Sequence, residues 1–325
     1  MNLNSSKLLF YSTMMMGIMM TISSNNWIMM WCGMEISLVS FIPLMISKSM
    51  MSSESSIKYF IVQSISSSML MLGVMFMVMK GDYNYKYLMM TALLMKTGIC
   101  PLHNWVLTVL EGLDFKMTFI MLSFNKIAPL TVLSYMMTSM SMSLVIFLTL
   151  ILGSIMGLNQ NSIKKLMGYS SIFNMGFILS IIKVNLMWML YLTVYSMLLL
   201  MMTNLMINSN INLINQMMFS SSMIISLTLW INMLSMGGMP PFMGFSIKYM
   251  VMILLLQNKL NLMISFMLLS SLLVMFFYLR MTFVSSMNNF ITNKIKLFYF
   301  KKMPMWIIVM NTMTLPMMLM VKICF

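Results

Sequence analysis

Apolar segments of about 20 residues recur along almost the whole chain and leave few charged residues to face water. Of the 325 residues, 61% are hydrophobic and 7% are charged, and the mean hydropathy is +0.94. A soluble domain carries about 25% charged residues, so this chain cannot cover a water-facing surface. Because one span needs about 20 apolar residues, the sequence predicts an all-α polytopic membrane protein of about eleven transmembrane helices.

The predicted organisation is a single membrane domain over residues 1–325, with polar loops and no soluble domain. The expected helices cover residues 8–24, 27–47, 57–79, 87–109, 117–139, 143–159, 166–182, 186–207, 221–257, 261–284 and 304–323. Two of these helices, 87–109 and 221–257, contain glycine and proline and are expected to be discontinuous.

The segment Leu93–Trp105 reads LLMKTGICPLHNW. It places Lys96 inside an apolar helix and interrupts that helix at Gly98 and Pro101, just before His103, the only histidine. A lysine near the middle of a membrane costs at least about 2–3 kcal/mol unless it has a partner, water or a function. Backbone groups freed at that depth need protein or an aqueous cavity to satisfy them. The combination is typical of ion-translocating membrane proteins.

Charged residues occur at a similar depth in four of the expected helices. Glu35 lies about eight residues into its helix, or roughly 12 Å at 1.5 Å per residue, near the middle of a hydrocarbon core of about 30 Å. Lys96 and Lys126 each lie about nine residues into their helices, and Lys248 about nine residues before the end of its half-helix. We therefore expect these four residues to form a row along the membrane.

A second helix break precedes Lys248 and repeats the arrangement around Lys96. It contains Gly237, Gly238, Met239, Pro240 and Pro241. A simple kink is the alternative interpretation. The nearby buried lysine favours a functional break instead.

The buried charges suggest a proton relay. Removal from water disfavours the charged form of a carboxylate or an amine, whereas a nearby opposite charge favours it. Glu35 and a lysine can therefore form a two-position electrostatic switch. Static ion pairs are the alternative, but one glutamate cannot neutralise Lys96, Lys126 and Lys248 together. His103 is either a further relay group or a hydrogen-bonding residue at a helix interface.

The composition points to a mitochondrial genome. Methionine occurs 56 times, while alanine occurs only at Ala92 and Ala128 and arginine only at Arg280. An A+T-rich genome in which AUA is read as methionine produces this bias. The first segment lacks the features of a cleaved signal or transit peptide. It is therefore either an uncleaved insertion signal or the start of a chain made inside the organelle.

The basic residues predict the orientation of the chain. With eleven spans, eleven of the 19 lysines and arginines fall on the side of the N-terminus, five fall on the other side, and three lie inside spans. The positive-inside rule then places the N-terminus in the matrix and the C-terminus in the intermembrane space. The basic residues stand singly in loops, so the net charge of +14 does not indicate nucleic acid.

The sequence offers no means of building a redox centre. It has no P-loop, no glycine-rich dinucleotide fingerprint and no CxxC pair, and a single histidine cannot supply a haem or metal site. Cys32, Cys100 and Cys324 are scattered and are interpreted as thiols in apolar surroundings. We expect no metal and no cofactor on this chain, and any redox chemistry belongs to a partner.

Four segments together resemble one known family. They are LLMKTGICPLHNWV (93–106), LSFNKIAPL (122–130), LNQNSIKKLMGYSSIFNMGF (158–177) and LSMGGMPPFMGFSIKYM (234–250). In combination they are similar to the NADH–ubiquinone oxidoreductase chain 2 family, in particular its insect and other invertebrate members. These are mitochondrially encoded, antiporter-like subunits of respiratory complex I. Any one segment alone is a weak signal.

The resemblance implies roles for the buried charges. In the family, the glutamate that matches Glu35 pairs with the lysine that matches Lys96, a central lysine corresponds to Lys126, and a terminal lysine corresponds to Lys248. Protons are thought to move between these sites when a change in the quinone region alters the Glu–Lys pairing. Where many relatives have a relay histidine this chain has Asn174, which cannot exchange a proton at physiological pH.

The resemblance also implies a setting in the mitochondrial inner membrane. The expected partners are other membrane subunits of complex I, including antiporter-like neighbours, and phospholipids. NADH, FMN, iron–sulfur clusters and ubiquinone are expected elsewhere in the complex. Two other hypotheses remain open: a free-standing secondary cation/proton antiporter, for which Glu35 is the only intramembrane acid, and a passive scaffold subunit.

Overall fold

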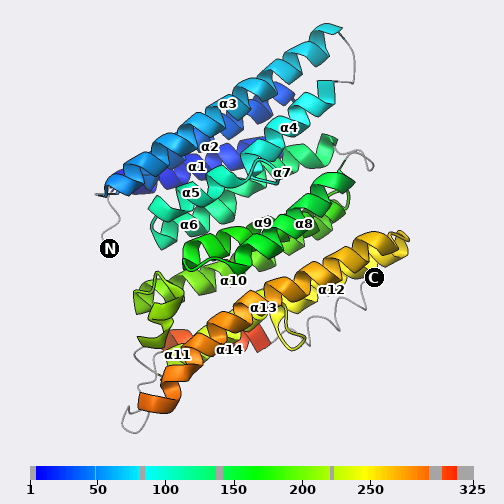
Figure 1. Ribbon diagram of the computed structural model, residues 1–325. Coiled ribbons are helices and arrows are strands. Elements are labelled where there is room, and N and C mark those ends of the chain that lie inside the picture. Colours follow the sequence, from blue (N-terminus) through cyan, green and yellow to red (C-terminus); the bar gives the residue numbers. More distant parts are fainter. Residues whose placement is uncertain are drawn as a thin grey trace. The chain divides into compact units, whose positions relative to one another are not determined.

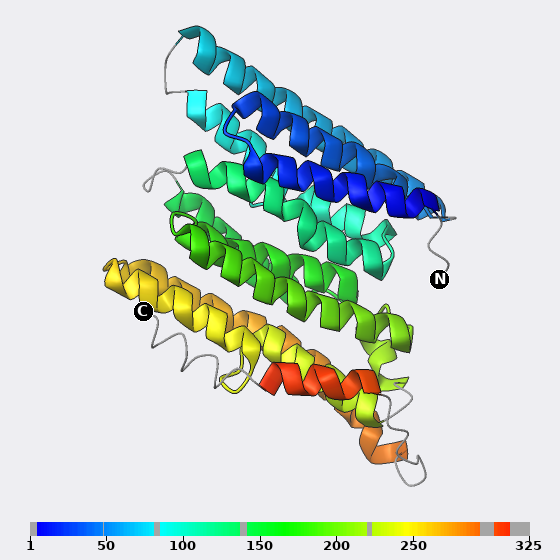
Figure 2. The same cartoon turned by 180° about the vertical axis from the view of Figure 1, so that it is seen from behind.

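The computed structural model is built from α-helices and describes residues 5–47, 49–80, 85–136, 142–219, 223–292 and 302–312. Its contacts divide the chain into two compact units, Met1–Val145 and Ile146–Phe325, and each unit is described by itself. Within each unit, Figures 1 and 2 show helices that run side by side along much of their length. The all-α class predicted from the sequence is confirmed.

The first unit has a group of long helices packed around a broken one. Its helices are α1 (Ser5–Ser23), α2 (Trp27–Met45), α3 (Met50–Lys80), α4 (Lys86–Thr97), α5 (Asn104–Gly112), α6 (Phe115–Leu122) and α7 (Phe124–Met136). Helix α1 packs along α2, as the blue helices in Figure 2 show, and α2 packs along α3. Helix α3 also contacts α4 and α5, and α7 contacts α1, α2 and α4. The broken helix α4–α5 is thereby held between α3 and α7.

Helix α3 begins at Met50, seven residues before the expected start at residue 57. The polar composition of this stretch suggested a loop, but its polar groups support a helix. The Ser53 hydroxyl donates to the Met50 carbonyl at 2.7 Å. Glu54 and Lys58 form an i,i+4 ion pair of 2.6 Å, a spacing that places both side chains on one face of a helix.

The expected helix over residues 117–139 is divided at Ser123 into α6 and α7. The Ser123 hydroxyl donates to the Phe119 carbonyl at 2.6 Å, and the Lys126 amide donates to the Ser123 carbonyl at 3.2 Å. This i+3 bond tightens the turn just before Lys126. The helix is thus interrupted three residues before a buried lysine.

The second unit packs its helices around α12. It contains most of α8 (Ser143–Leu158), then α9 (Ile163–Ile181), α10 (Asn185–Ser209), the 3₁₀ helix η2 (Ile214–Phe219), α11 (Met223–Gly237), α12 (Met243–Gln257), α13 (Asn261–Thr292) and α14 (Lys302–Thr312). Helix α12 contacts α9, α10, α11 and α13, and α11 packs along α13. Nearly every residue of α9 is buried. The polar segment that follows α10 is partly ordered into η2.

Arg280 ties α13 to the end of α8. Its guanidinium donates to the carbonyls of Leu158 and Gln160, each at 2.7 Å. These carbonyls lie at the C-terminal end of α8, where no further helical amide is available to them. A cation at that position also complements the helix dipole. The single arginine of the chain is therefore a structural anchor.

Several helices have the length and apolarity that a membrane crossing requires. By length and composition, five described spans qualify: Trp27–Met45, Met50–Met79, Phe115–Met136, Leu186–Ser209 and Asn261–Ser286. Their outward faces are apolar; on α13, Leu262, Leu269, Leu272, Phe276 and Phe283 are each more than 60% exposed. Such faces suit lipid or a neighbouring membrane subunit. The chain is a polytopic membrane protein.

Candidate functional site

The break between α4 and α5 is closed by a specific hydrogen-bond pattern. Gly98 has a φ of 70°, in the left-handed region that favours glycine. Its amide donates to the Met95 carbonyl at 3.2 Å, and the Ile99 amide donates to the Leu94 carbonyl at 3.1 Å. This is the Schellman pattern, which ends a helix while satisfying its last carbonyls. It fixes Lys96 in the last turn of α4.

Two side chains from neighbouring helices bind carbonyls near this break. The Gln63 amide on α3 donates to the Lys96 carbonyl at 3.2 Å. The indole of Trp105 on α5 donates to the Met95 carbonyl at 3.1 Å. A membrane interior requires such partners for freed backbone groups. These contacts hold the end of α4 rigidly between α3 and α5.

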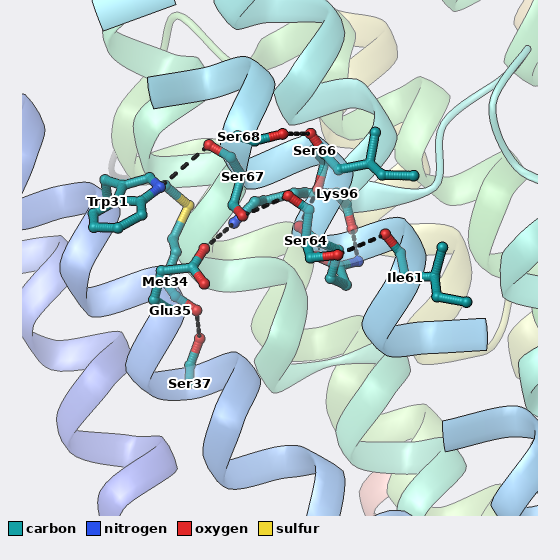
Figure 3. A network of polar contacts seen from close by, with 12 residues as sticks. Trp31, Met34, Glu35, Ser37, Ile61, Ser64, Ser66, Ser67, Ser68 and Lys96 are labelled. Carbon is teal, nitrogen blue, oxygen red and sulfur yellow. Dashed lines mark hydrogen bonds and ion pairs between the residues drawn. The ribbon is translucent and has the colours of Figure 1, made fainter. Parts of the chain in front are cut away.

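Lys96 is paired with Glu35 across α4 and α2. The Lys96 Nζ lies 3.4 Å from Glu35 Oε1, and the side chains are 4% and 26% exposed, respectively. Figure 3 shows the two charged groups pointing toward one another, with the serines of α3 beside them. In the same view the Trp31 indole donates to the Ser67 carbonyl at 3.2 Å. The structure thus brings together the glutamate and the first of the three predicted lysines.

Lys96 and Lys126 line one small cavity within the first unit. Its volume is about 30 Å³, enough for about two water molecules at roughly 15 Å³ each. Polar groups are prominent in its lining, which contains Ser37, Tyr59, Gln63, Lys96, Thr97, Trp105, Asn125 and Lys126. Lys126 is 5% exposed, and its ammonium has no hydrogen bond or ion pair to any described residue. The cavity is therefore the polar environment of the Lys126 ammonium.

Asn125 is an unexpected member of this site. Both polar atoms of its amide are buried, and neither has a hydrogen-bond partner among the described residues. Pro129, which also lines the cavity, has no amide proton to donate to the Asn125 carbonyl four residues earlier. Neither Asn125 nor Gln63 was predicted from the sequence as a site residue. The sequence does contain a signal for Asn125: it is an amide side chain next to a lysine in an apolar helix, and a proline follows four residues later.

His103 lies on the break itself, outside the lining of this cavity. It is 8% exposed. Its Nδ1 lies 3.3 Å from Cys100 Sγ and 3.2 Å from the Pro101 carbonyl oxygen. These contacts orient the imidazole within its own turn. They favour the hydrogen-bonding role over the relay role at this position.

Lys248 occupies a corresponding break in the second unit. Gly238 has a φ of 89°; its amide donates to the Ser235 carbonyl at 3.1 Å, and the Met239 amide donates to the Leu234 carbonyl at 3.1 Å. This is the same Schellman pattern as at Gly98. The chain then passes through Pro240 and Pro241 before α12 begins.

The Lys248 side chain folds back onto the end of α11. Its Nζ donates to the Gly237 carbonyl at 2.9 Å and lies 5.4 Å from the centroid of the Phe173 ring. Lys248 is 4% exposed, and no carboxylate among the described residues pairs with it. A helix C-terminus and an aromatic face both attract a cation. Lys248 thus has weaker partners than Lys96.

The structure therefore groups the predicted site residues by unit. Glu35, Lys96 and Lys126 lie together in the first unit, around the break at Gly98 and Pro101. Lys248 lies in the second unit on the break from Gly237 to Pro241. Within the described residues, no group of three or more histidine, cysteine, aspartate or glutamate side chains is arranged to hold a metal ion.

The sequence matches a family of ion-translocating membrane proteins. The family model described as NADH:quinone oxidoreductase/Mrp antiporter, transmembrane, matches residues 24–88 and 80–274. NADH-ubiquinone oxidoreductase chain 2 of Anopheles gambiae is 35% identical over 88% of this chain and 87% of its own length. The chain belongs to the NADH-ubiquinone oxidoreductase chain 2 family. Two further members are similarly related. The protein from Locusta migratoria is 34% identical over 86% of this chain and 85% of its own length, and the protein from Dasypus novemcinctus is 33% identical over 94% of each chain.

Solved structures support the same fold. A chain of respiratory complex I from Thermus thermophilus has a TM-score of 0.79 and 19% identity, covering 94% of this chain and 75% of its own. A chain of the archaeal membrane-bound sulfane sulfur reductase has a TM-score of 0.77 and 19% identity, and the match covers 97% of this chain and 74% of that chain. At these identities the likeness concerns the fold. The family resemblance expected from the sequence, and its antiporter-like architecture, are confirmed.

Proposed function

We propose that this antiporter-like membrane subunit of NADH-ubiquinone oxidoreductase moves protons across the inner mitochondrial membrane through Glu35, Lys96, Lys126 and Lys248. NADH oxidation and ubiquinone reduction take place in other subunits, which carry the FMN and iron–sulfur clusters. This chain supplies buried titratable groups and an internal polar cavity. The observation that carries the proposal is that Lys96 contacts Glu35 and also lines the cavity that contains Lys126.

Lys96 connects the Glu35 carboxylate to the cavity in the proposed relay. A buried ammonium is stabilised by a nearby carboxylate and destabilised when that carboxylate is neutralised or withdrawn. Protonation or movement of Glu35 therefore prompts Lys96 to release a proton into the cavity. Water in the cavity passes the proton to Lys126, which has no carboxylate partner among the described residues. The return of the Glu35 charge recharges Lys96 and resets the switch.

Lys248 acts in the same way at the second break. Its ammonium is held by the Gly237 carbonyl and the Phe173 ring, which are neutral groups. A neutral partner stabilises a buried cation less than a carboxylate does. A charge that arrives nearby can therefore shift its protonation, which is the property that a terminal relay group needs.

The helices combine into eleven proposed spans. Taking α4 with α5, α6 with α7, and α11 with α12 as single interrupted spans leaves eleven crossings, two of which carry glycine–proline breaks. An odd number of crossings places the termini on opposite sides. The excess of basic residues then places the N-terminus in the matrix and the C-terminus in the intermembrane space. The apolar outer faces would contact phospholipid and neighbouring membrane subunits.

Replacement of Lys126 by methionine tests the relay. Methionine has a similar length and is apolar, and replacement of a buried charge by an apolar residue of similar volume is often neutral for stability. In the assembled complex we expect Lys126→Met to lower the rate of NADH-driven proton translocation at least about tenfold, since positioned proton-transfer groups contribute roughly 10²- to 10⁴-fold. Proton uptake by sealed vesicles, normalised to the assembled complex, measures this.

The matched control is Lys7→Met, which removes an exposed lysine near the start of α1. It should assemble and translocate protons at the unmodified rate. Full proton translocation by an assembled Lys126→Met complex would rule out the relay. It would favour a scaffold role for this chain.

A further inference from the structure

A second cluster of buried polar side chains lies in the second unit, outside the Glu–Lys site. We call it the hydroxyl cluster. It consists of Ser170, Ser171 and Asn174 on α9, Tyr191 and Tyr195 on α10, and Tyr278 on α13. None of these residues is more than 5% exposed. Three tyrosine hydroxyls are thus buried beside an amide and two serines.

The contacts within the hydroxyl cluster are incomplete. The Tyr191 hydroxyl donates to Asn174 Oδ1 at 2.8 Å. The Tyr195 hydroxyl lies close to the side chains of Ser170, Ser171 and Asn174 and to Tyr278, yet it makes no hydrogen bond of standard geometry to a described residue. The Tyr278 hydroxyl lies close to Ser170 and is likewise unpaired among the described residues.

This arrangement is difficult to explain by packing alone. Buried tyrosine hydroxyls normally have a hydrogen-bond partner, and phenylalanine supplies the same ring without that requirement. The aromatic packing here is already made by the rings, as in the stacked pair of Phe177 and Tyr191 at 6.1 Å. Two buried hydroxyls that lie near each other and near Ser170, without a partner among the described residues, are groups that a bridging water would bind.

The hydroxyl cluster adjoins Lys248. Helix α12, which carries Lys248, packs against α9, α10 and α13, the three helices that supply the cluster. Lys248 Nζ lies over Phe173, the residue before Asn174. A Cβ atom at Gly237, whose carbonyl accepts from Lys248, would lie 3.6 Å from Tyr278 Cβ. Phe173 and Gly237 therefore place the Lys248 ammonium beside the helix segments that carry Asn174 and Tyr278.

We propose that the hydroxyl cluster is a water-binding proton wire, in which Tyr278 and Tyr195 carry protons between Lys248 and the α9 side of the second unit. The proposal rests on the proposed function, because it gives Lys248 a proton donor or acceptor. It adds a site that the four buried charges do not include. Asn174 borders this wire, and its side-chain oxygen accepts a hydrogen bond from the Tyr191 hydroxyl.

The transfer conserves charge at every hydroxyl. The Lys248 ammonium gives one proton to a bridging water, and that water gives one of its own protons to the Tyr278 oxygen. Tyr278 releases its original hydroxyl proton to the next water or to Tyr195. Tyr195 in turn releases its own hydroxyl proton to a water on the α9 side, beside Ser170 and Ser171, and that water takes the proton onward. One O–H bond forms and one breaks at each oxygen, so each tyrosine ends neutral. Rotation of each hydroxyl about its C–O bond then resets the wire.

The same geometry accounts for Asn174 at this position. Its Oδ1 accepts a hydrogen bond, but an amide does not exchange a proton at physiological pH. A route that avoids side chain 174 is therefore needed, and the neighbouring hydroxyls offer one. A histidine introduced at position 174 could itself accept and release a proton.

The variants Tyr195→Phe and Tyr278→Phe test the wire, because each keeps the ring and removes the hydroxyl. In the assembled complex we expect each to lower the proton translocation rate at least about threefold. The loss should be smaller than the roughly 10²-fold typical of a positioned proton-transfer group, since water can partly replace one hydroxyl. Tyr249→Phe is the matched control, because Tyr249 follows Lys248 on α12 but is 43% exposed. Loss of this hydroxyl should leave the proton translocation rate unchanged.

A rescue variant separates proton transfer from packing. Asn174→His in the Tyr195→Phe background should restore at least half of the lost rate, because the imidazole supplies a new exchangeable site. A loss that the histidine does not relieve would assign the effect to packing and overturn the wire. Unchanged translocation in both tyrosine variants, with Lys248→Met inactive, would also overturn the wire while leaving the proposed function intact. Full activity of Lys248→Met would instead overturn the proposed function.

Discussion

Lys96 and Lys248 are both associated with the C-terminal end of a helix closed by a left-handed glycine: Lys96 lies in the last turn of α4, and the Lys248 ammonium reaches from α12 to the end of α11. A cation there is favoured by about 0.3–1 kcal/mol at exposed sites and up to about 2 kcal/mol when partly buried. Removal of the charge from water costs several kcal/mol, so the helix end alone does not stabilise the charged lysine. Lys96 has Glu35 in addition, and Lys248 has the Phe173 ring. This difference in partners suits a sequence of proton transfers between unlike sites.

Asn125 gives a residue-scale prediction in which stability and activity change in opposite directions. Its amide is buried and unpaired among the described residues and lines the cavity with both lysines. Asn125→Leu removes two unsatisfied polar atoms, each of which costs about 1–3 kcal/mol when no partner is present. We expect the melting temperature of the assembled complex to stay level or rise while proton translocation falls at least about threefold, because the cavity loses a water ligand.

A structural role for Asn125 predicts the reverse, a lower melting temperature with unchanged translocation per assembled complex. Thermal unfolding and proton uptake on the same preparation distinguish the two. Asn125→Gln keeps an amide and should retain part of the activity. Loss of assembly in Asn125→Leu, with normal translocation in the remainder, would contradict the proposed water-binding role.

At the scale of the elements, the break between α11 and α12 allows a comparison of two adjacent glycines, Gly237 and Gly238. Gly238 has a φ of 89°, and a Cβ there would lie 2.8 Å from Lys248 Nζ. A Cβ at Gly237 would meet its nearest neighbours at 3.6 Å, an ordinary van der Waals distance. Gly238→Ala should therefore displace the Lys248 ammonium and cost about 1–2 kcal/mol for the left-handed backbone. Gly237→Ala should be close to neutral.

The measurement for this pair is proton translocation per assembled complex, with thermal stability recorded in parallel. We expect Gly238→Ala to reduce both and Gly237→Ala to retain both. Equal behaviour of the two variants would show that the left-handed residue and its contact with Lys248 do not determine the function of the break.

The elements show which features a sequence can reveal. Glycine and proline next to a buried lysine are local signals, so the breaks near Gly98 and Gly238 could be predicted without a structure. The start of α3 could not, because the serines before residue 57 suggest a loop by composition while their hydroxyls bond to helical carbonyls. The division at Ser123 was also missed, since a single serine in an apolar helix usually signals nothing.

The site shows the same limit. Glu35 and the lysines are conspicuous because charge is rare in an apolar segment, and that rarity was sufficient to select them. Asn125 and Gln63 become members of the site only through the packing of α3 and α7 around α4. The hydroxyl cluster likewise combines side chains of the consecutive helices α9 and α10 with Tyr278 of α13, which is far from them in sequence. Serine and tyrosine are common in this chain, so their number alone could not identify which of them meet.

At the scale of the whole molecule, a lysine lies beside a helix break of the same hydrogen-bond pattern in each unit, as far as the described residues show. Among the described residues, Lys96, Lys126 and Lys248 are buried, and only Lys96 pairs with a carboxylate, that of Glu35, so these residues do not neutralise their own buried charge. A free-standing antiporter usually needs a carboxylate ion site of its own. A subunit of a larger assembly can instead respond to charges that arise in its neighbours, which is the role expected of a member of the NADH-ubiquinone oxidoreductase chain 2 family.

This difference yields a prediction about assembly. Detergent-solubilised mitochondrial membranes, separated on a native gel and stained for NADH dehydrogenase activity, should contain this chain only in the large NADH-oxidising band. Apolar spans give few detectable peptides, so identification should target the tryptic peptide that follows Arg280 and ends at Lys294. Recovery of the chain alone or in a small oligomer, with active complex lacking it, would favour the free antiporter, and ion-flux assays on that species would then identify the ion it carries.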